Sequence, residues 1–193
     1  MFVRLFCGGL HGVDAFRVDL EVDLNRQGMP AFTMVGLAEG AVREAKDRVF
    51  AALRSSGFKI PPARITVNLA PADCRKSGAA YDLPLAVGLL VAAEVLSPEA
   101  VQGYFFAGEL SLTGSIKPAP GALPLAILAR SEQGRGLFVS PGNAYEAAVV
   151  RGLPVFAPEN LCQCVAFLQG AAPLSPVPVS ALPDTSLQDY PQD

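Results

Sequence analysis

Basic side chains are concentrated between residues 43 and 76 of this 193-residue sequence. Eight basic residues occur there against three acidic ones, and this local excess of positive charge could bind phosphate groups. A solvated helix face crossed by i,i+4 ion pairs would give the same composition, and the sequence leaves both interpretations open. The candidate contacts to nucleic acid are Arg43, Lys46, Arg54, Arg75 and Lys76.

A polar loop at residues 71–79 carries Arg75, Lys76 and Ser77. A serine and a lysine could act as nucleophile and base, but two adjacent residues of one loop need not face each other. We therefore favour a solvated or ligand-contacting loop. Asp82 could be a catalytic acid, yet its place just before an apolar helix predicts a helix N-cap, which stabilises by about 1 kcal/mol.

Histidine and cysteine are too sparse for a metal site. His11, the only histidine, lies in a Gly-rich turn and is interpreted as a turn residue. The four cysteines, Cys7, Cys74, Cys162 and Cys164, lack metal-type spacing and are typical of buried or idle thiols in a reducing cytoplasm. The longest apolar run, residues 83–93, is too short to cross a bilayer. We expect a cytoplasmic protein with no metal and no membrane partner.

The polar loop must be positioned by the elements on either side of it. Residues 65–69 predict a buried strand that ends before Pro71, which has no backbone N–H to donate. Residues 82–93 predict a helix that is apolar on every side, so it should lie at the centre of the core.

Shorter elements surround this centre. Alternating residues predict a hairpin of strands 3–10 and 15–24, and residues 31–36 predict a third strand. Helical spacing predicts a helix at 37–56 and another at 122–131, with Leu123, Ile127 and Leu128 facing inward. A second hairpin is expected at 104–110 and 111–117, and the last third alternates strands 136–139 and 154–156 with helices 144–151 and 160–169.

This order of elements predicts a mixed α/β (α+β) fold, with one mixed sheet covered mainly on one face by helices. The folded domain should span residues 1–170. Residues 171–193 contain five prolines and no Lys or Arg, which is typical of a linker or disordered end.

Three segments resemble a known family. They are GLAEGAVREAKDRVFAALRSSGF at 36–58, RITVNLAPADCRKSGAAYDLPLAVGLL at 64–90 and FAGELSLTGSIKPAPGALPLAILAR at 106–130. In this order they are similar to the N-terminal domain of the bacterial magnesium-chelatase-like AAA+ ATPases, a group that includes competence proteins. The resemblance covers about residues 3–170. It implies the ribosomal protein S5 domain 2-like fold, which the proteolytic domain of Lon and the C-terminal domain of the repair protein RadA share.

The resemblance also implies a AAA+ module after the Pro-rich segment. ATP and Mg²⁺ are expected to bind in that module, because this sequence contains no GxxxxGK[ST] loop to hold phosphates. No cofactor is therefore expected in residues 1–193 themselves. The expected partners are the AAA+ module, other copies of the chain in a homo-oligomer such as a hexamer, and DNA.

Lon-like relatives that cut peptides use a serine at the start of the central helix and a lysine at the start of the next. By motif, the serine position corresponds to Ala80 and the lysine position to Leu123, and neither side chain can do this chemistry. The resemblance therefore implies a degenerate dyad and no catalytic residue in this chain.

We accordingly expect a non-catalytic accessory domain that positions nucleic acid, or assembles subunits, for an ATP-driven DNA motor of the branch migration or natural transformation type. A purely structural oligomerisation collar is the main alternative. A metal chelatase subunit is disfavoured, because a single histidine and no ligand cluster give no metal site. A degenerate Ser-Lys peptidase is disfavoured by Ala80 and Leu123.

Overall fold

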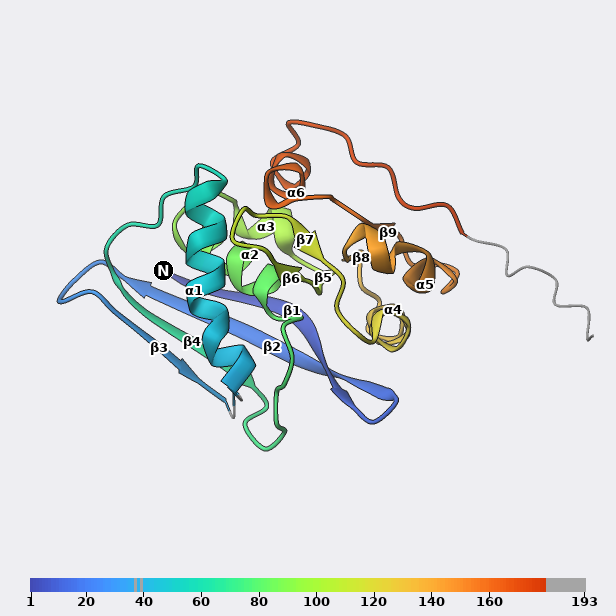
Figure 1. The fold of residues 1–193 in the computed structure, drawn as a ribbon, viewed down its shortest axis with the longest axis horizontal. Helices are drawn as coiled ribbons and strands as arrows, with labels where there is room; N and C mark the ends of the chain where they lie inside the picture. Colours follow the sequence, from blue (N-terminus) through green and yellow to red (C-terminus); the bar gives the residue numbers. More distant parts are fainter. Residues whose placement is uncertain (37, 39, 180–193) are drawn as a thin grey trace, which may run out of the picture.

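The computed structural model describes residues 1–179, apart from residues 37 and 39. Seven of the described strands form one mixed sheet in the order β3-β4-β2-β1-β5-β8-β9 (Figure 1). The mixed α/β fold expected from the sequence is confirmed. The strands of this sheet are β1 (Phe2–His11), β2 (Asp14–Asn25), β3 (Ala31–Val35), β4 (Arg64–Ala70), β5 (Tyr104–Phe106), β8 (Gly136–Phe138) and β9 (Val155–Phe156).

The predicted long hairpin of β1 and β2 is confirmed and forms the middle of the sheet. The two strands pair antiparallel from Phe2 opposite Asp23 to His11 opposite Asp14. β4 pairs antiparallel with β2, and β3 pairs parallel with β4 at the edge of the sheet. On the other side of the hairpin, β5, β8 and β9 continue as parallel strands.

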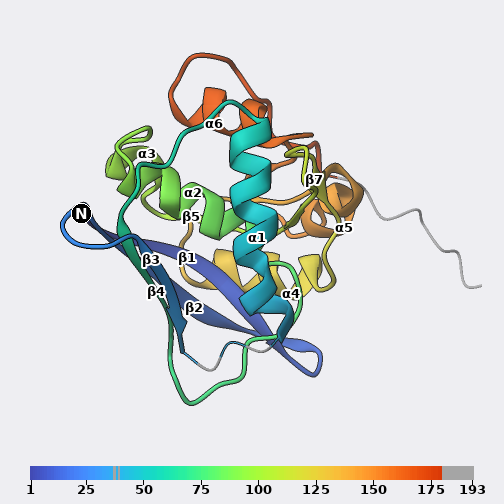
Figure 2. The ribbon, with the colours of Figure 1, turned by 60° about the vertical axis from the view of Figure 1, so that its left-hand side comes forward.

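One face of the hairpin is covered by α1 (Gly40–Ser55) and α2 (Asp82–Ala92), which lie beside each other in both views (Figure 1 and Figure 2). The short α3 (Pro98–Val101) and α6 (Leu161–Leu168) add residues to the same hydrophobic core. The predicted helix at 37–56 thus begins at Gly40 in the described chain, and Leu37 lies outside the described residues.

The prediction that the central helix is buried on every side is confirmed. All residues of α2 are buried, from Asp82 to Ala92. Gly88 lets this helix approach the hairpin closely, because a Cβ atom there would lie only 3.0 Å from Val22 and 3.1 Å from Leu5. The polar loop at 71–79 therefore lies between β4, whose alternate residues are buried, and a fully buried helix.

Helices also cover part of the opposite face, which the sequence did not predict. α4 (Ala122–Ser131) and α5 (Ala144–Ala148) pack there in a second hydrophobic cluster with Leu137 and Val155. The approach of α4 depends on Gly8 of β1, where any Cβ atom would overlap the side chain of Leu125. The missing side chain of one glycine thus makes room for a helix on the second face.

The predicted boundaries of α4 are confirmed, but its predicted inward face is wrong for two of three residues. Leu123 and Ile127 are 37% and 55% exposed, whereas Leu128 is partly buried and packs against the second cluster. Three of the four buried residues are alanines, which let the helix lie close to the sheet. The buried residues of α4 are Ala122, Leu125, Ala126 and Ala129.

The second predicted hairpin is wrong in its first strand. Residues 104–106 form β5, which enters the large sheet parallel to β1, whereas only β6 (Glu109–Leu110) and β7 (Ile116–Lys117) form a small antiparallel pair. The chain leaves the large sheet at Ala107 and Gly108, where the Gly108 amide donates to the carbonyl of Ala80 (3.0 Å). The alternating elements predicted for the last third are confirmed.

The segment after α6 remains packed beyond the expected domain end at residue 170. Leu174 packs against the main core, and Val177 packs against the second cluster while its amide donates to the Val155 carbonyl (2.8 Å). Residues 171–179 thus lie against the folded domain. The rest of the expected linker, residues 180–193, lies outside the described residues.

Candidate nucleic-acid interface

Arg48 and Asp82 form an ion pair that joins α1 to the first residue of α2. The guanidinium of Arg48 donates from Nε to Oδ2 (2.8 Å) and from Nη2 to Oδ1 (3.0 Å) of Asp82, whose Oδ2 also accepts from the Leu110 amide (3.1 Å). The side chain of Asp82 is fully buried. Burial raises the pKa of Asp82, while Arg48 and the Leu110 amide favour the carboxylate.

The prediction that Asp82 caps the helix is therefore wrong. Tyr81 occupies the N-cap position, and no side chain there accepts a capping hydrogen bond. The carboxylate of Asp82 turns toward Arg48 instead, because a buried charge needs a partner of opposite charge more than the helix needs a cap. Arg48 belongs by the same contact to the structural frame rather than to a free basic surface.

Lys76 is also part of the structural frame. Its side chain is fully buried, its ammonium donates to the carbonyl of Pro71, and its backbone bridges to Ala38 just before α1. Burial lowers the pKa of Lys76. The expectation that Lys76 is solvated or contacts a ligand is therefore wrong, because no surface ligand can reach a fully buried ammonium.

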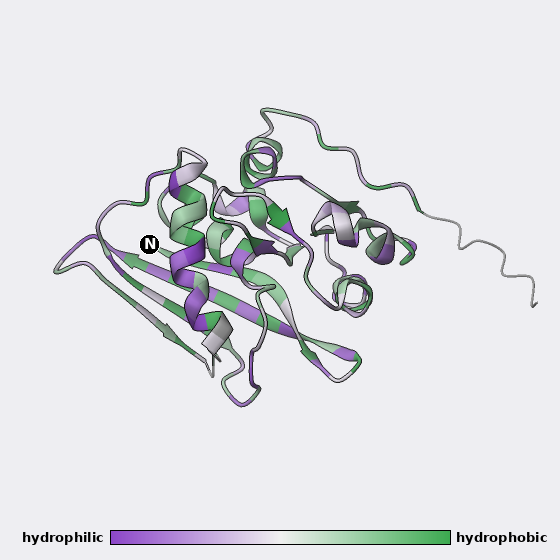
Figure 3. Ribbon diagram, viewed as in Figure 1, coloured by the Kyte–Doolittle hydropathy of each residue, from purple (hydrophilic) through white to green (hydrophobic). Residues whose placement is uncertain are grey.

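Three of the other cationic candidates share one stripe of α1. Arg43, Lys46, Phe50 and Arg54 follow at steps of three, four and four residues, which places them along one side of a helix. Polar segments lie along the outer side of α1 in Figure 3. The three cations are exposed and Phe50 is half-buried. The sequence thus brings an aromatic ring between charges on a single helix side.

This stripe borders a continuous hollow between α1 and the segment that leads to β4. Two adjoining hollows of about 440 and 310 Å³ share Phe50, Ile60, Pro61 and Pro62 in their walls. Phe58 and Lys59 line the first, and Phe32 and Lys46 line the second. We call the hollow the α1 groove and define it by Lys46, Phe50, Arg54, Phe58, Lys59, Ile60, Pro61 and Pro62.

The cations of the α1 groove lack carboxylate partners among the residues that the structure describes. Within the described part of the chain, Lys46, Arg54 and Lys59 form no ion pair. The Lys46 ammonium lies 5.5 Å from the ring centroid of Phe32, and that ring meets Phe50 edge-on. Arg43, one turn further toward the start of α1, donates from Nε to the Ala38 carbonyl (3.1 Å).

Arg75 lies in a different hollow. It lines a crevice of about 660 Å³ between the tip of the β1–β2 hairpin and the polar loop, together with His11, Asp14 and Ser77. The structure therefore brings Arg43, Lys46 and Arg54 together, and it does not bring Arg75 or Lys76 to the same groove. The distribution of basic residues in the sequence did not distinguish Arg43, Lys46 and Arg54 from Arg75 and Lys76.

Ala80 and Leu123 lie near the starts of two different helices, α2 and α4, with the short α3 between these helices in the chain. Ala80 comes two residues before α2, and its carbonyl accepts from the Gly108 amide (3.0 Å). Leu123 lies in the first turn of α4, and its amide donates to the carboxylate of Glu146 (3.1 Å). An alanine methyl and a leucine side chain offer neither a nucleophile nor a base at these positions.

The face of β2 that points away from α1 and α2 carries charges of both signs. Asp19, Glu21 and Asp23 alternate along it, and all three have partners: Asp19 pairs with Arg17 (2.7 Å) and Arg4 (3.8 Å), Glu21 accepts from Asn68 (2.8 Å), and Asp23 lies 3.9 Å from the amino group of Met1. The arginines Arg4 and Arg17 of this face are thus already paired with carboxylates. Lys46, Arg54 and Lys59 of the α1 groove form no such pair in the described chain, which makes the groove the better suited of the two surfaces to a polyanion.

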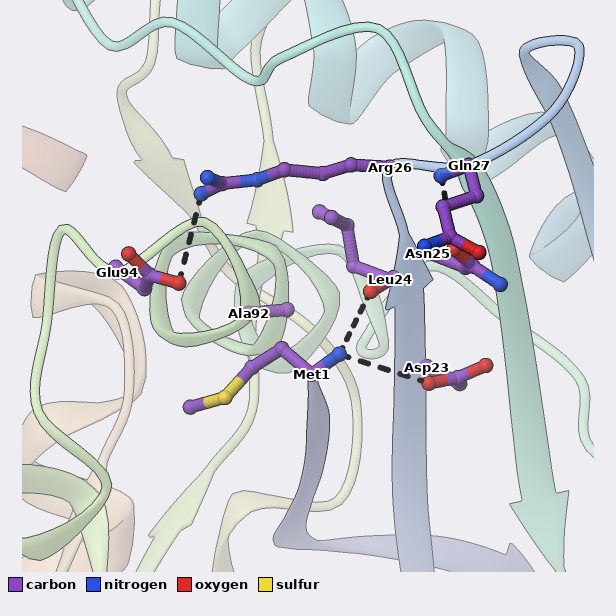
Figure 4. Close-up of a pocket in the computed structure, with 8 residues that line it drawn as sticks. All are labelled: Met1, Asp23, Leu24, Asn25, Arg26, Gln27, Ala92 and Glu94. Atoms are coloured by element: carbon purple, nitrogen blue, oxygen red, sulfur yellow. Dashed lines mark hydrogen bonds and ion pairs between the residues drawn. The ribbon is translucent and has the colours of Figure 1, made fainter.

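A further hollow of about 360 Å³ lies at the end of the hairpin, beside the end of α2 (Figure 4). Its charged groups already have partners. The amino group of Met1 donates to the Leu24 carbonyl (2.7 Å) and lies 3.9 Å from Asp23, while Arg26 reaches across to Glu94 (3.5 Å). These contacts close the end of the sheet and leave this hollow without an unpaired charge to attract a ligand.

The described residues contain no group of three or more His, Cys, Asp or Glu side chains arranged to hold a metal ion. None of their helices has the length and apolar character that a membrane span requires.

Sequence reasoning missed the second wall of the α1 groove. Lys59, Phe50 and Phe58 are not among the residues for which the sequence predicts a role in binding. The spacing of Phe50 between Lys46 and Arg54 on one side of the helix is the sequence pattern that could have indicated the α1 groove. The contribution of Pro61 and Pro62 could not be found in this way, because it depends on how the chain folds back from α1 to β4.

Comparison with known proteins places the chain in a family. The family described as subunit ChlI of Mg-chelatase matches residues 20–143. The chain is 44% identical over 159 residues to competence protein ComM of Haemophilus influenzae and 43% identical over 159 residues to the uncharacterized protein YifB of Salmonella typhimurium; both matches cover 82% of this chain and 31% of the relative. YifB of Escherichia coli is 41% identical over 172 residues, covering 89% of this chain and 34% of the relative.

The chain thus spans about a third of the length of these relatives. The match includes the polar loop, the central helix and α1, the elements on which the resemblance was based. On these matches, the chain belongs to the magnesium-chelatase-like family of YifB and ComM.

Proposed function

We propose that this chain is a non-catalytic accessory domain that holds nucleic acid for an ATP-driven motor formed by the rest of a longer protein. The observation that carries the proposal is the α1 groove, where Lys46, Arg54 and Lys59 surround apolar walls without forming an ion pair in the described chain. Cations without carboxylate partners remain available for phosphates.

Two further observations support the accessory role. Ala80 and Leu123 supply neither a nucleophile nor a base at the starts of α2 and α4. The chain carries no phosphate-binding GxxxxGK[ST] loop, so ATP and Mg²⁺ are assigned to a AAA+ module of the longer protein. One relative carries the name competence protein, which fits a motor that acts on DNA during uptake or recombination.

The test is a binding titration of the 193-residue chain with labelled DNA at low and moderate salt. The variant Lys46→Glu/Arg54→Glu/Lys59→Glu should bind at least tenfold more weakly, because three attractive charges become repulsive. A matched control is Lys117→Glu/Arg130→Glu/Arg151→Glu, which makes the same charge change at exposed positions outside the groove. Equal binding by both variants would remove the α1 groove from the proposal.

One observation favours a second role in subunit assembly. Leu123, Ile127 and Tyr145 expose 37%, 55% and 66% of their surfaces on the neighbouring helices α4 and α5. Adjacent exposed apolar side chains are typical of contacts between subunits. Sedimentation of the wild-type chain and of Ile127→Asp tests this role. The role requires that the wild-type chain forms an oligomer and that the substitution dissociates it. A wild-type chain that stays monomeric at high concentration would contradict the role in assembly.

A further inference from the structure

We propose that the α1 groove takes the unpaired bases of a single-stranded nucleic acid, while the cations at its rim bind the phosphates. This inference rests on the proposed function and adds the class of nucleic acid. It depends on the walls of the groove, whereas the proposed function depends only on its charges.

The walls of the groove are apolar and partly aromatic. Phe50 and Phe58 are half-buried, pack against the main core and line the larger hollow. Ile60, Pro61 and Pro62 complete the walls of the larger hollow. A flat, weakly polar nucleobase fits such walls, because every base has a π-face that can pack on an aromatic ring.

The cations lie on both sides of these walls. Lys46 and Arg54 border Phe50 on α1, and Lys59 follows Phe58 on the opposite wall. A single strand alternates bases with phosphates, so it can place a base between the walls while its backbone meets the rim. A duplex keeps its bases paired and stacked, so it cannot place a base between the walls of the groove.

The composition of the groove favours nucleic acid over an acidic peptide. An extended peptide binds largely through backbone hydrogen bonds to an exposed chain. Pro61 and Pro62 have no backbone N–H to donate, so the second wall is a poor partner for a peptide backbone. The groove instead combines ring surfaces with separated positive charges, which are the two features that single-strand binding uses.

The experiment compares three DNA ligands of equal length by fluorescence anisotropy at one salt concentration. They are an oligothymidine, an abasic strand with the same sugar-phosphate backbone, and a duplex. We expect the 193-residue chain to bind oligothymidine about tenfold more tightly than the abasic strand, since only the first ligand has bases to stack.

Phe50→Leu and Phe58→Leu keep an apolar side chain but remove the ring. Each should weaken oligothymidine binding about five- to tenfold and leave abasic and duplex binding within twofold. Phe2→Leu is the matched control, because Phe2 is an exposed phenylalanine outside the groove, and it should change none of the three. Circular dichroism melting of each variant separates loss of binding from loss of folding.

The outcomes distinguish this inference from the proposed function. If the charge-reversal variant loses binding but oligothymidine and abasic strands bind equally to the wild type, the base-stacking inference is wrong and the proposed function stands. If charge reversal in the groove has no more effect than in the control variant, the α1 groove does not hold nucleic acid, and both this inference and the proposed role of the groove are wrong. Tighter binding of a labelled acidic peptide of equal charge than of oligothymidine would also overturn the inference.

Discussion

Arg48→Met should destabilise the domain more than Asp82→Ala, although both remove the same ion pair. The two side chains differ in exposure: Asp82 is fully buried, whereas 23% of the Arg48 side chain is exposed. Without Arg48, the carboxylate keeps the Leu110 amide but loses its opposite charge inside the core. Without Asp82, the guanidinium can turn toward water.

The structure sets the expected magnitudes. Removing one partner of a buried pair costs about 3–5 kcal/mol, and the partial exposure of Arg48 places Arg48→Met near the lower end, at about 3 kcal/mol. Asp82→Ala loses charge-assisted hydrogen bonds and should cost about 2 kcal/mol. The double variant should cost at least about 1 kcal/mol less than the sum, because the two side chains interact directly.

Urea unfolding followed by circular dichroism measures all three free energies. The pH dependence provides a further check. Burial raises the pKa of Asp82 already in the wild type, and loss of Arg48 raises it further. At a pH between the pKa of Asp82 in the unfolded chain and its pKa in the folded chain, the folded state binds more protons than the unfolded state. The free energy of unfolding of Arg48→Met should therefore rise relative to that of the wild type as the pH falls from 7 to 5.

Equal costs for the two single variants, or a double variant equal to their sum, would refute this reasoning. Either result would mean that the contact between α1 and α2 depends on apolar packing alone. The position of α1 also bears on the proposed function, because the same helix carries Lys46 and Arg54, which border the α1 groove.

Three further predictions follow from buried groups. Gly8→Ala should cost about 1–3 kcal/mol in thermal or urea unfolding, because the added methyl overlaps the buried Leu125; an unchanged midpoint would contradict the close packing of α4. As the pH rises from 7 to 10, the free energy of unfolding of Lys76→Met should fall relative to that of the wild type. Burial lowers the pKa of Lys76, so in this range the unfolded wild type binds more protons than the folded wild type, and the stability of the wild type rises with pH. A constant difference between the two proteins would argue against a buried ammonium. A thiol reagent should modify the exposed Cys162 first, since burial raises the pKa of Cys164 to about 12; mass spectrometry that finds Cys164 modified first would contradict the burial.

The elements of the fold were predictable where one local pattern dominates. The alternation along β2 and the uniformly apolar α2 each predict their structure without tertiary information. The inward face of α4 was not predictable in this way. It depends on the close approach of α4 to Gly8 of β1, where Leu125 occupies the space of the missing side chain.

The candidate site was predictable only in part. Helical spacing already placed Arg43, Lys46 and Arg54 on one side of α1. The burial of Lys76 was not predictable, because a lysine in a polar loop is normally solvated and only the packing of that loop against α1 buries it. The second wall of the groove, with Lys59, depends on a chain reversal that no local pattern encodes.

The salt dependence of single-stranded DNA binding tests the central claim most directly. If Lys46, Arg54 and Lys59 each neutralise one phosphate, the logarithm of the association constant should fall against the logarithm of salt concentration with a slope of about −2. Lys46→Glu/Arg54→Glu/Lys59→Glu should bring that slope close to zero. A slope that is the same in the wild type and this variant would contradict the claim that the α1 groove binds nucleic acid.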